Sequence, residues 1–195
     1  DLDSTLTITA ASIDNQTGKL RALGNTGITR FQIGGRLNNQ SGMLETANND
    51  ISLTTGSLLN TGGSIVHAGK GNFGLASSDV MNAGGNFTTG GDLTLDADSW
   101  TNSGVIQAGT LNVNIKDFTQ TATGQLLAST AFLGTGDTWV NDGVVGSDGT
   151  LGLKLTGAYS GSGRMSSLAD LKMNAAQLDL DAPASITGGG KTEVN

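Results

Sequence analysis

The stretch SWTNSGVIQAGTLNV, residues 99–113, contains the pattern that decides the fold. Trp100 is followed two residues later by Asn102, then by Gly104 and, two residues beyond, by the apolar Ile106. Trp100 is one of only two tryptophans, so it is a candidate for an exposed ligand-binding platform as well as for a core residue. The rest of the chain distinguishes these roles, because the same pattern recurs along it.

Aligned on Trp100, the chain divides into nine units spaced by 18 to 24 residues. Each unit has an apolar anchor at this position: Ile13, Leu37, Leu58, Val80, Trp100, Phe118, Trp139, Ala158 and Leu178. Two residues later a mostly polar column follows: Asn15, Asn39, Asn60, Asn82, Asn102, Gln120, Asn141, Ser160 and Leu180. Self-similarity at a period of about 20 residues is typical of solenoid proteins.

Apolar residues also recur five and seven residues before each anchor and alternate there with polar residues, which is the period of a β-strand. The second unit departs from this pattern, because Arg30 and Gln32 hold these positions. We interpret this unit as carrying a one-residue insertion, so that Phe31 and Ile33 fill the two columns. Gly134 is a second exception, at the position five residues before Trp139.

One unit buries too little apolar surface to offset the ordering of its own backbone, but stacked units share a continuous core. We therefore predict an all-β fold, a parallel β-helix of about nine rungs and roughly 40 Å in length. We expect it to be right-handed, as parallel crossover connections nearly always are. Trp100 and Trp139 should lie in the core. The Asn column should form a side-chain ladder at a turn, where Asn also tolerates left-handed backbone geometry.

Composition narrows the function classes. The chain has 195 residues, 31 glycines, no cysteine and a net charge of −7. The absence of cysteine excludes disulfides and cysteine metal sites, and the acidic balance argues against nucleic acid as a partner. We interpret residues 1–195 as a single β-helical segment of a much longer filamentous protein, because no recognisable start or finish occurs at either end.

Two motifs with possible chemistry are incomplete. GGGKT at residues 188–192 resembles the end of a phosphate-binding loop, but Ser185 stands where that loop requires its first glycine. His67 is the only histidine, which excludes a metal site with two histidines. Because Ala68 aligns with Ala108 if the third unit is one residue longer, we expect His67 in a bulge or at the surface.

The enzyme alternative is a polysaccharide lyase or hydrolase, which needs carboxylates that converge in one groove. Asp92, Asp96 and Asp98 alternate with apolar residues, so we expect them to project outward as a solvated face. No repeat column is acidic. We therefore predict that the segment is not an enzyme and has no catalytic residues, no metal site and no cofactor.

Units such as LTLDADSWTNSGVIQAGTLNV and SLLNTGGSIVHAGKGNFGL resemble the haemagglutinin repeats of filamentous haemagglutinin and of contact-dependent growth inhibition (CdiA-type) exoproteins. The resemblance extends from Leu6 to about Ile186. It implies secretion through a dedicated outer-membrane two-partner secretion transporter and a β-helical filament on the surface of a Gram-negative cell. It also implies recognition of another cell, and in CdiA-type proteins the delivery of a toxin.

We therefore expect a structural and recognition segment that contacts an outer-membrane protein of a neighbouring bacterium. The alternatives are an adhesin segment that binds a host glycan or protein, and a passive stalk. One outward column has mostly small polar side chains: Ser52, Gly74, Thr94, Asn112, Gly152 and Lys172. Specificity should then come from departures from the repeat, with Arg30, Arg36, His67 and Lys70 as the candidate receptor-binding residues.

Overall fold

The computed structural model describes residues 5–82 and 84–195, apart from the side chains of Met81 and Asn82. Its 21 strands all pair in parallel and form one continuous stack of about nine rungs, and the described residues contain no helix. The predicted all-β parallel β-helix is confirmed. Segments in which apolar and polar residues alternate are strands throughout the chain. Each short strand is stabilised by hydrogen bonds to the equivalent strands one rung above and one rung below.

The strands form three faces along the stack. Face A contains β1 (Leu6–Ala10), the first parts of β4 (Ile28–Asn38), β6 (Asp50–Leu59), β8 (Asn72–Asn82) and β10 (Asp92–Asn102), the middle of β11 (Val105–Gln120), the end of β12 (Gln125–Gly136), β15 (Thr150–Leu155), β18 (Leu171–Asn174) and β21 (Thr192–Val194). Face B contains β2 (Ile13–Asp14), the ends of β4, β6, β8, β10 and β11, and then β13 (Thr138–Asn141), β16 (Ala158–Gly161) and β19 (Gln177–Leu180). Face C contains β3 (Lys19–Ala22), β5 (Met43–Thr46), β7 (Ser64–His67), β9 (Asn86–Thr89), the starts of β11 and β12, β14 (Val144–Ser147), β17 (Arg164–Ser167) and β20 (Ser185–Gly188).

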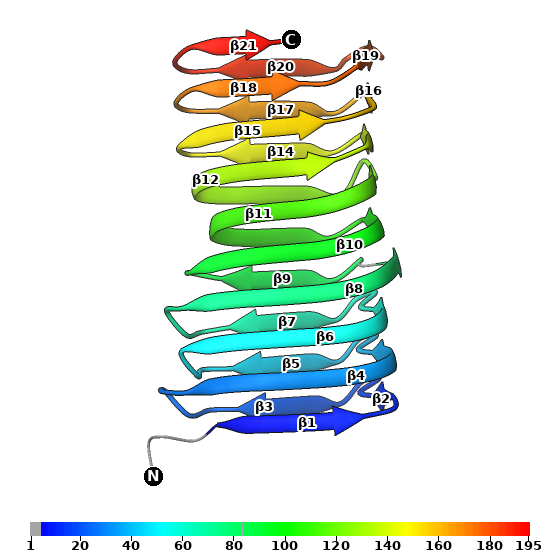
Figure 1. Ribbon diagram of the computed structural model, residues 1–195, viewed down its shortest axis with the longest axis vertical. Coiled ribbons are helices and arrows are strands. Elements are labelled where there is room, and N and C mark those ends of the chain that lie inside the picture. The colour runs from blue at the N-terminus through cyan, green and yellow to red at the C-terminus, as the bar shows by residue number, and fades with distance from the viewer. Residues whose placement is uncertain (1–4, 83) are drawn as a thin grey trace.

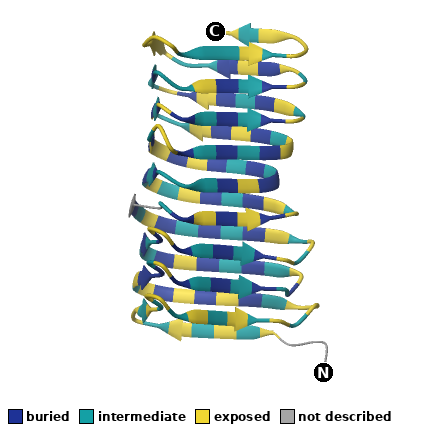
Figure 2. Cartoon of the chain, turned by 180° about the vertical axis from the view of Figure 1, so that it is seen from behind, coloured by how far each residue is buried: buried dark blue, intermediate teal, exposed yellow. Residues whose placement is uncertain are grey.

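The coil is right-handed. In Figure 1 the strands nearest the viewer, such as β4 and β6, run from left to right, whereas β5 and β7 behind them run from right to left. The chain climbs from the N-terminus at the bottom to the C-terminus at the top. Figure 2 shows buried and exposed residues in alternation along most strands, so one side of each strand faces the core.

Both tryptophans lie in the core, as predicted, with Trp100 1% and Trp139 0% exposed. Their rings pack on neighbouring aromatic residues, because Phe87 lies 5.7 Å from Trp100 and Phe118 lies 4.9 Å from Trp139 between ring centroids. One anchor was predicted wrongly. Tyr159, not Ala158, pairs with Trp139 and is 2% exposed, because the preceding turn is one residue longer than the repeat suggests.

The predicted placement of Phe31 and Ile33 is wrong. Thr29 occupies the column predicted for Phe31 and pairs with Leu6 and Ile51. Phe31 occupies the column predicted for Ile33 and pairs with Ile8 and Leu53. The extra residue lies farther on, at the register shift before Arg36. Thr29 can be fully buried because its hydroxyl makes a hydrogen bond of 2.8 Å to the hydroxyl of Thr46.

Gly134 breaks the apolar column because the indole of Trp139 needs its space. A Cβ atom at Gly134 would lie 2.7 Å from Cη2 of Trp139 and 2.6 Å from Cδ1 of Leu153. The same indole donates its Nε1–H to the carbonyl oxygen of Ile115 at 2.9 Å. A large side chain on one strand and a glycine on another therefore fill one layer of the core together.

Candidate functional site

The first half of the Asn column forms a side-chain ladder inside the turn. Nδ2 of Asn15 donates to Oδ1 of Asn39 at 2.7 Å, and Nδ2 of Asn39 donates to Oδ1 of Asn60 at 2.7 Å. Asn39 and Asn60 are fully buried. The side chain of Asn82, the next predicted member, lies outside the described residues, and among those described Nδ2 of Asn60 has no acceptor.

The second half of the ladder continues through different residue types. Nδ2 of Asn102 donates to Oε1 of Gln120 at 3.1 Å, and Nε2 of Gln120 donates to Oδ1 of Asn141 at 2.8 Å. Nδ2 of Asn141 then donates to the hydroxyl of Tyr159 at 3.0 Å, so Tyr159 takes the place expected of Ser160. Burial raises the pKa of Tyr159 to about 12, which keeps its hydroxyl neutral.

Asn occupies this column for its side chain and not for its backbone. The left-handed conformations occur two residues later, with φ of 56° at Thr17, 52° at Ser41 and 66° at Gly62. The predicted backbone role of Asn is therefore wrong. The buried amides bind the rungs to one another, and because they face the interior they offer nothing to a partner.

His67 is wrongly predicted as a surface residue. It aligns with Thr46 and Thr89 in an inward column of face C and is 2% exposed. Its Nε2 lies 3.1 Å from the carbonyl oxygens of both Asn48 and Asn49, which only accept, so Nε2 carries the proton. Its Nδ1 makes a hydrogen bond of 3.0 Å with the hydroxyl of Thr89. With both ring nitrogens bonded inside the protein, His67 cannot contact a receptor.

The other three candidate receptor-binding residues are exposed but are not brought together as one site. Arg30 projects from face A, and Arg36 lies at the corner between faces A and B. Lys70 lies in the turn between β7 and β8, at the opposite edge of face A.

The acidic residues that the structure describes form no metal-binding cluster. Asp92, Asp96 and Asp98 are exposed, and Oδ1 of Asp96 accepts from Nδ2 of Asn114 at 2.9 Å. In the described ranges no group of three or more His, Cys, Asp or Glu residues could hold a metal ion. Elsewhere a carboxylate binds the next rung: Asp142 accepts from the backbone N–H of Ser162 at 3.0 Å, which lowers its pKa.

The GGGKT sequence forms a turn between β20 and β21 and no phosphate-binding loop. The backbone N–H of Lys191 donates to Oδ1 of Asp170 at 2.8 Å, and its ammonium group pairs with the carboxylate of Glu193. The groups that a phosphate would need are therefore engaged within the protein. Within the part of the chain that the structure describes, no helix is long and apolar enough to span a membrane.

Face A has a hollow of about 400 Å³ that the sequence analysis missed, which we call the Leu133 hollow. Leu133 belongs to the outward column that begins at Ser52, and its side chain is 52% exposed. It leans over Gly152, where a Cβ atom would lie 3.1 Å from Cδ2 of Leu133. Lys154 and Lys172 also line this hollow, so face A is less uniform than the small polar residues predicted.

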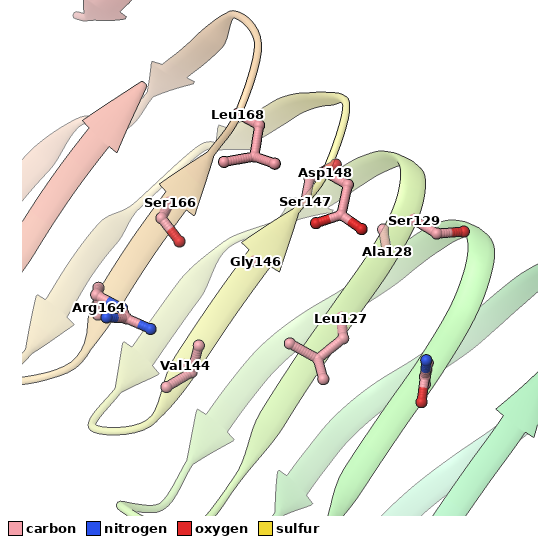
Figure 3. Close-up of a pocket in the computed structure, with 11 residues that line it drawn as sticks. Leu127, Ala128, Ser129, Val144, Gly146, Ser147, Asp148, Arg164, Ser166 and Leu168 are labelled. Atoms are coloured by element: carbon pink, nitrogen blue, oxygen red, sulfur yellow. The ribbon is translucent and has the colours of Figure 1, made fainter. Parts of the chain in front are cut away.

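Face C has a second hollow of about 290 Å³, which we call the Gly146 hollow. In Figure 3 Gly146 on β14 lies between Leu127 on β12 and Ser166 on β17. Because Gly146 has no side chain, the outward surface is recessed there between its neighbours. Val144 and Leu168 provide apolar walls, and the side chain of Leu168 is 73% exposed.

Charged groups stand at two ends of the Gly146 hollow. Arg164 and Asp148 lie on opposite sides of Gly146 in Figure 3. Both are exposed, and in the described chain neither takes part in an ion pair. Only the stacking of the rungs reveals this arrangement, since the residues that line the hollow come from four different units of the sequence.

These features define the chain as a right-handed parallel β-solenoid with a hydrogen-bonded interior and shallow hollows on faces A and C. A comparison with protein-family models gave no match, and neither the curated proteins nor the solved structures compared with this chain gave one.

Proposed function

We propose that this segment is a structural and recognition part of a bacterial cell-surface filament of the contact-dependent growth inhibition type. In this proposal it contacts an outer-membrane protein of a neighbouring bacterium, while another part of the filament presents the toxin. The resemblance of its repeat units to haemagglutinin repeats supports this function.

The single observation that carries the proposal is the rung architecture. Nine rungs with a continuous core form a stiff rod, and the rod presents three extended faces to the outside. Such a scaffold holds a binding surface away from the cell that carries it. Departures such as the Leu133 hollow and the Gly146 hollow give two of these faces local features that a partner protein can recognise.

Secretion by a two-partner transporter in the outer membrane of a Gram-negative bacterium is part of the same proposal. The chain has no cysteine, so no disulfide could block its passage in an unfolded state. Its backbone can fold rung by rung after emerging, because each rung contacts mainly its neighbours.

We also propose that the segment has no catalytic activity. A lyase or hydrolase needs carboxylates that converge at a separation suited to acid and base roles, whereas the exposed Asp92, Asp96 and Asp98 follow one another along β10. The test is incubation with acidic and neutral polysaccharides. Reproducible turnover that a single Asp or Glu substitution abolishes would contradict this proposal.

Binding to whole cells tests the recognition role. The purified segment, labelled with a fluorophore, is added to bacterial cells and to host cells over a range of concentrations. Saturable binding to bacteria that disappears when one outer-membrane protein is deleted is the expected result. Binding to host cells alone would replace this function with that of an adhesin. Binding to neither, while a longer piece of the filament does bind, would make the segment a passive stalk.

A further inference from the structure

We propose that the Gly146 hollow binds one extended peptide segment of a partner protein, with the pattern acidic, spacer, apolar, spacer, basic. The inference rests on the proposed function only in taking the partner of the filament to be a protein. It assigns the contact to one place on face C, where a recess with apolar walls at Leu127, Val144 and Leu168 lies between two charges of opposite sign.

The register of face C sets the spacing of the three features. Arg164 pairs with Val144 at the start of the strands, Ser166 pairs with Gly146 in the middle, and Asp148 lies one residue beyond the end of β14. Outward side chains recur at every second residue. Arg164 and Asp148 are therefore four positions apart along the strand direction, or about 13 Å, and one rung apart, or about 5 Å.

An extended peptide has the same repeat as the surface beneath it. Its side chains i, i+2 and i+4 lie on one face, with steps of about 6.6 Å. An acidic residue at i can therefore meet Arg164, an apolar residue at i+2 can enter the recess over Gly146 against Leu127, and a basic residue at i+4 can meet Asp148. A peptide that runs in the opposite chain direction also fits, provided that its basic residue comes first and its acidic residue last.

Gly146 alone opens this recess in its column. The outward column contains a side chain on every other described rung: Arg21, Glu45, Val66, Thr88, Gln107, Leu127, Ser166 and Thr187. A Cβ atom at Gly146 would lie 3.5 Å from Leu127 and 4.0 Å from Ser166, which are ordinary contacts. The fold therefore does not require glycine here, and the recess is available to a ligand.

The charges of the hollow complement such a peptide. Among the described residues, four of the ten basic side chains form ion pairs, for example Arg21 with Glu45 at 2.7 Å and Lys172 with Glu193 at 3.6 Å, and Arg164 is among those that do not. Arg164 and Asp148 line one hollow, yet they form no ion pair with each other or with other described residues. A segment carrying both charges at the stated spacing can satisfy both groups at once.

Fluorescence anisotropy with a labelled heptapeptide, Thr-Glu-Ser-Val-Ser-Lys-Thr, tests the proposal on the intact segment. Saturable binding is expected, and Gly146→Val should weaken it at least ten-fold by filling the recess. Valine suits a strand, so this variant should keep the fold. Gly74→Val is the matched control, because the outward Gly74 on face A has nothing within 4 Å of a Cβ atom, and it should bind like the wild type.

Charge variants test the orientation. Arg164→Gln and Asp148→Asn should each weaken binding by up to about five-fold, which is the upper end for exposed ion pairs. The affinity of the Arg164→Gln variant for the peptide should not fall further when the Glu of the peptide is replaced by Gln. A peptide of the same composition with adjacent charges should bind at least five-fold more weakly. Absence of saturable binding, equal binding of the two peptides, or unchanged binding to Gly146→Val would overturn the proposal.

Binding to cells separates failure of this site from failure of the proposed function. If the wild type binds bacterial cells and Gly146→Val binds them equally well, recognition stands and the Gly146 hollow is not its site. If the peptide binds as expected but the segment binds no cell, the hollow is a peptide site and the proposed cell recognition is wrong.

Discussion

Substitution of Gly134 by alanine should destabilise the protein although it adds one methyl group to a strand. The new Cβ would lie 2.6 Å from Leu153, 2.7 Å from Trp139 and 3.1 Å from Phe132, whereas carbon atoms prefer separations of about 3.5–4.0 Å. Overpacking of this kind costs about 1–3 kcal/mol. The lower backbone entropy of alanine in the unfolded chain offsets about 0.4–1 kcal/mol. We expect a net loss of about 1–2 kcal/mol in the free energy of unfolding.

A double-mutant cycle with Trp139→Phe identifies the cause. Phenylalanine lacks the Cη2 atom that meets the new methyl group, so Gly134→Ala should cost about 1 kcal/mol less in the Trp139→Phe background. Trp139→Phe alone should cost about 1–3 kcal/mol, because the carbonyl of Ile115 loses its buried donor. Urea unfolding followed by circular dichroism measures all four proteins. Gly74→Ala is the control and should stay within about 0.5 kcal/mol of the wild type.

Two results would refute this reasoning. Gly134→Ala could be as stable as Gly74→Ala, which would mean that the layer around Trp139 has room for a methyl group. Alternatively, the two substitutions at Gly134 and Trp139 could be additive within about 0.3 kcal/mol, which would mean that the indole does not occupy this space.

Three further predictions concern the interior ladder and the turns. Gln120→Leu should lower the free energy of unfolding by about 1–3 kcal/mol in urea, since it removes one hydrogen bond from each of its ladder neighbours, Asn102 and Asn141. Tyr159 is the only tyrosine, so an absorbance titration should give a midpoint near pH 12, and a midpoint near 10 would contradict its burial. Because burial raises this folded-state pKa from 10.0 to about 12, stability should fall by about 2 kcal/mol as the pH rises from 10 to 12. For Asp142 the pKa is lowered, so its stabilisation exists above its ordinary pKa of 3.8 and disappears as the pH falls through the folded-state value. Asp142→Asn should therefore reduce the loss of stability in acid, and Ser162→Ala should reduce it less, because it removes the hydroxyl donor but keeps the backbone N–H donor.

The sequence by itself determined the architecture. Apolar residues occur at every second position, and the pattern repeats about every 20 residues. Such short strands can bury their apolar side chains only by stacking in parallel, and this holds whatever the details of each turn. For the same reason Trp100 and Trp139 could be placed in the core. Both stand in a column that is apolar in all nine units.

The tertiary structure alone decided where polar residues face and where the surface is recessed. Thr29 and His67 point inward because partners 17 to 22 residues away in the sequence satisfy their hydrogen bonds, and no local pattern reveals such a partner. Tyr159 replaces Ala158 because one added residue in a turn shifts the register of a strand, and a shift of one residue exchanges inward and outward side chains. The Gly146 hollow exists only through the neighbours that the stack places beside it. Periodicity therefore specifies the rod, whereas contacts between rungs specify which of its residues a partner can reach.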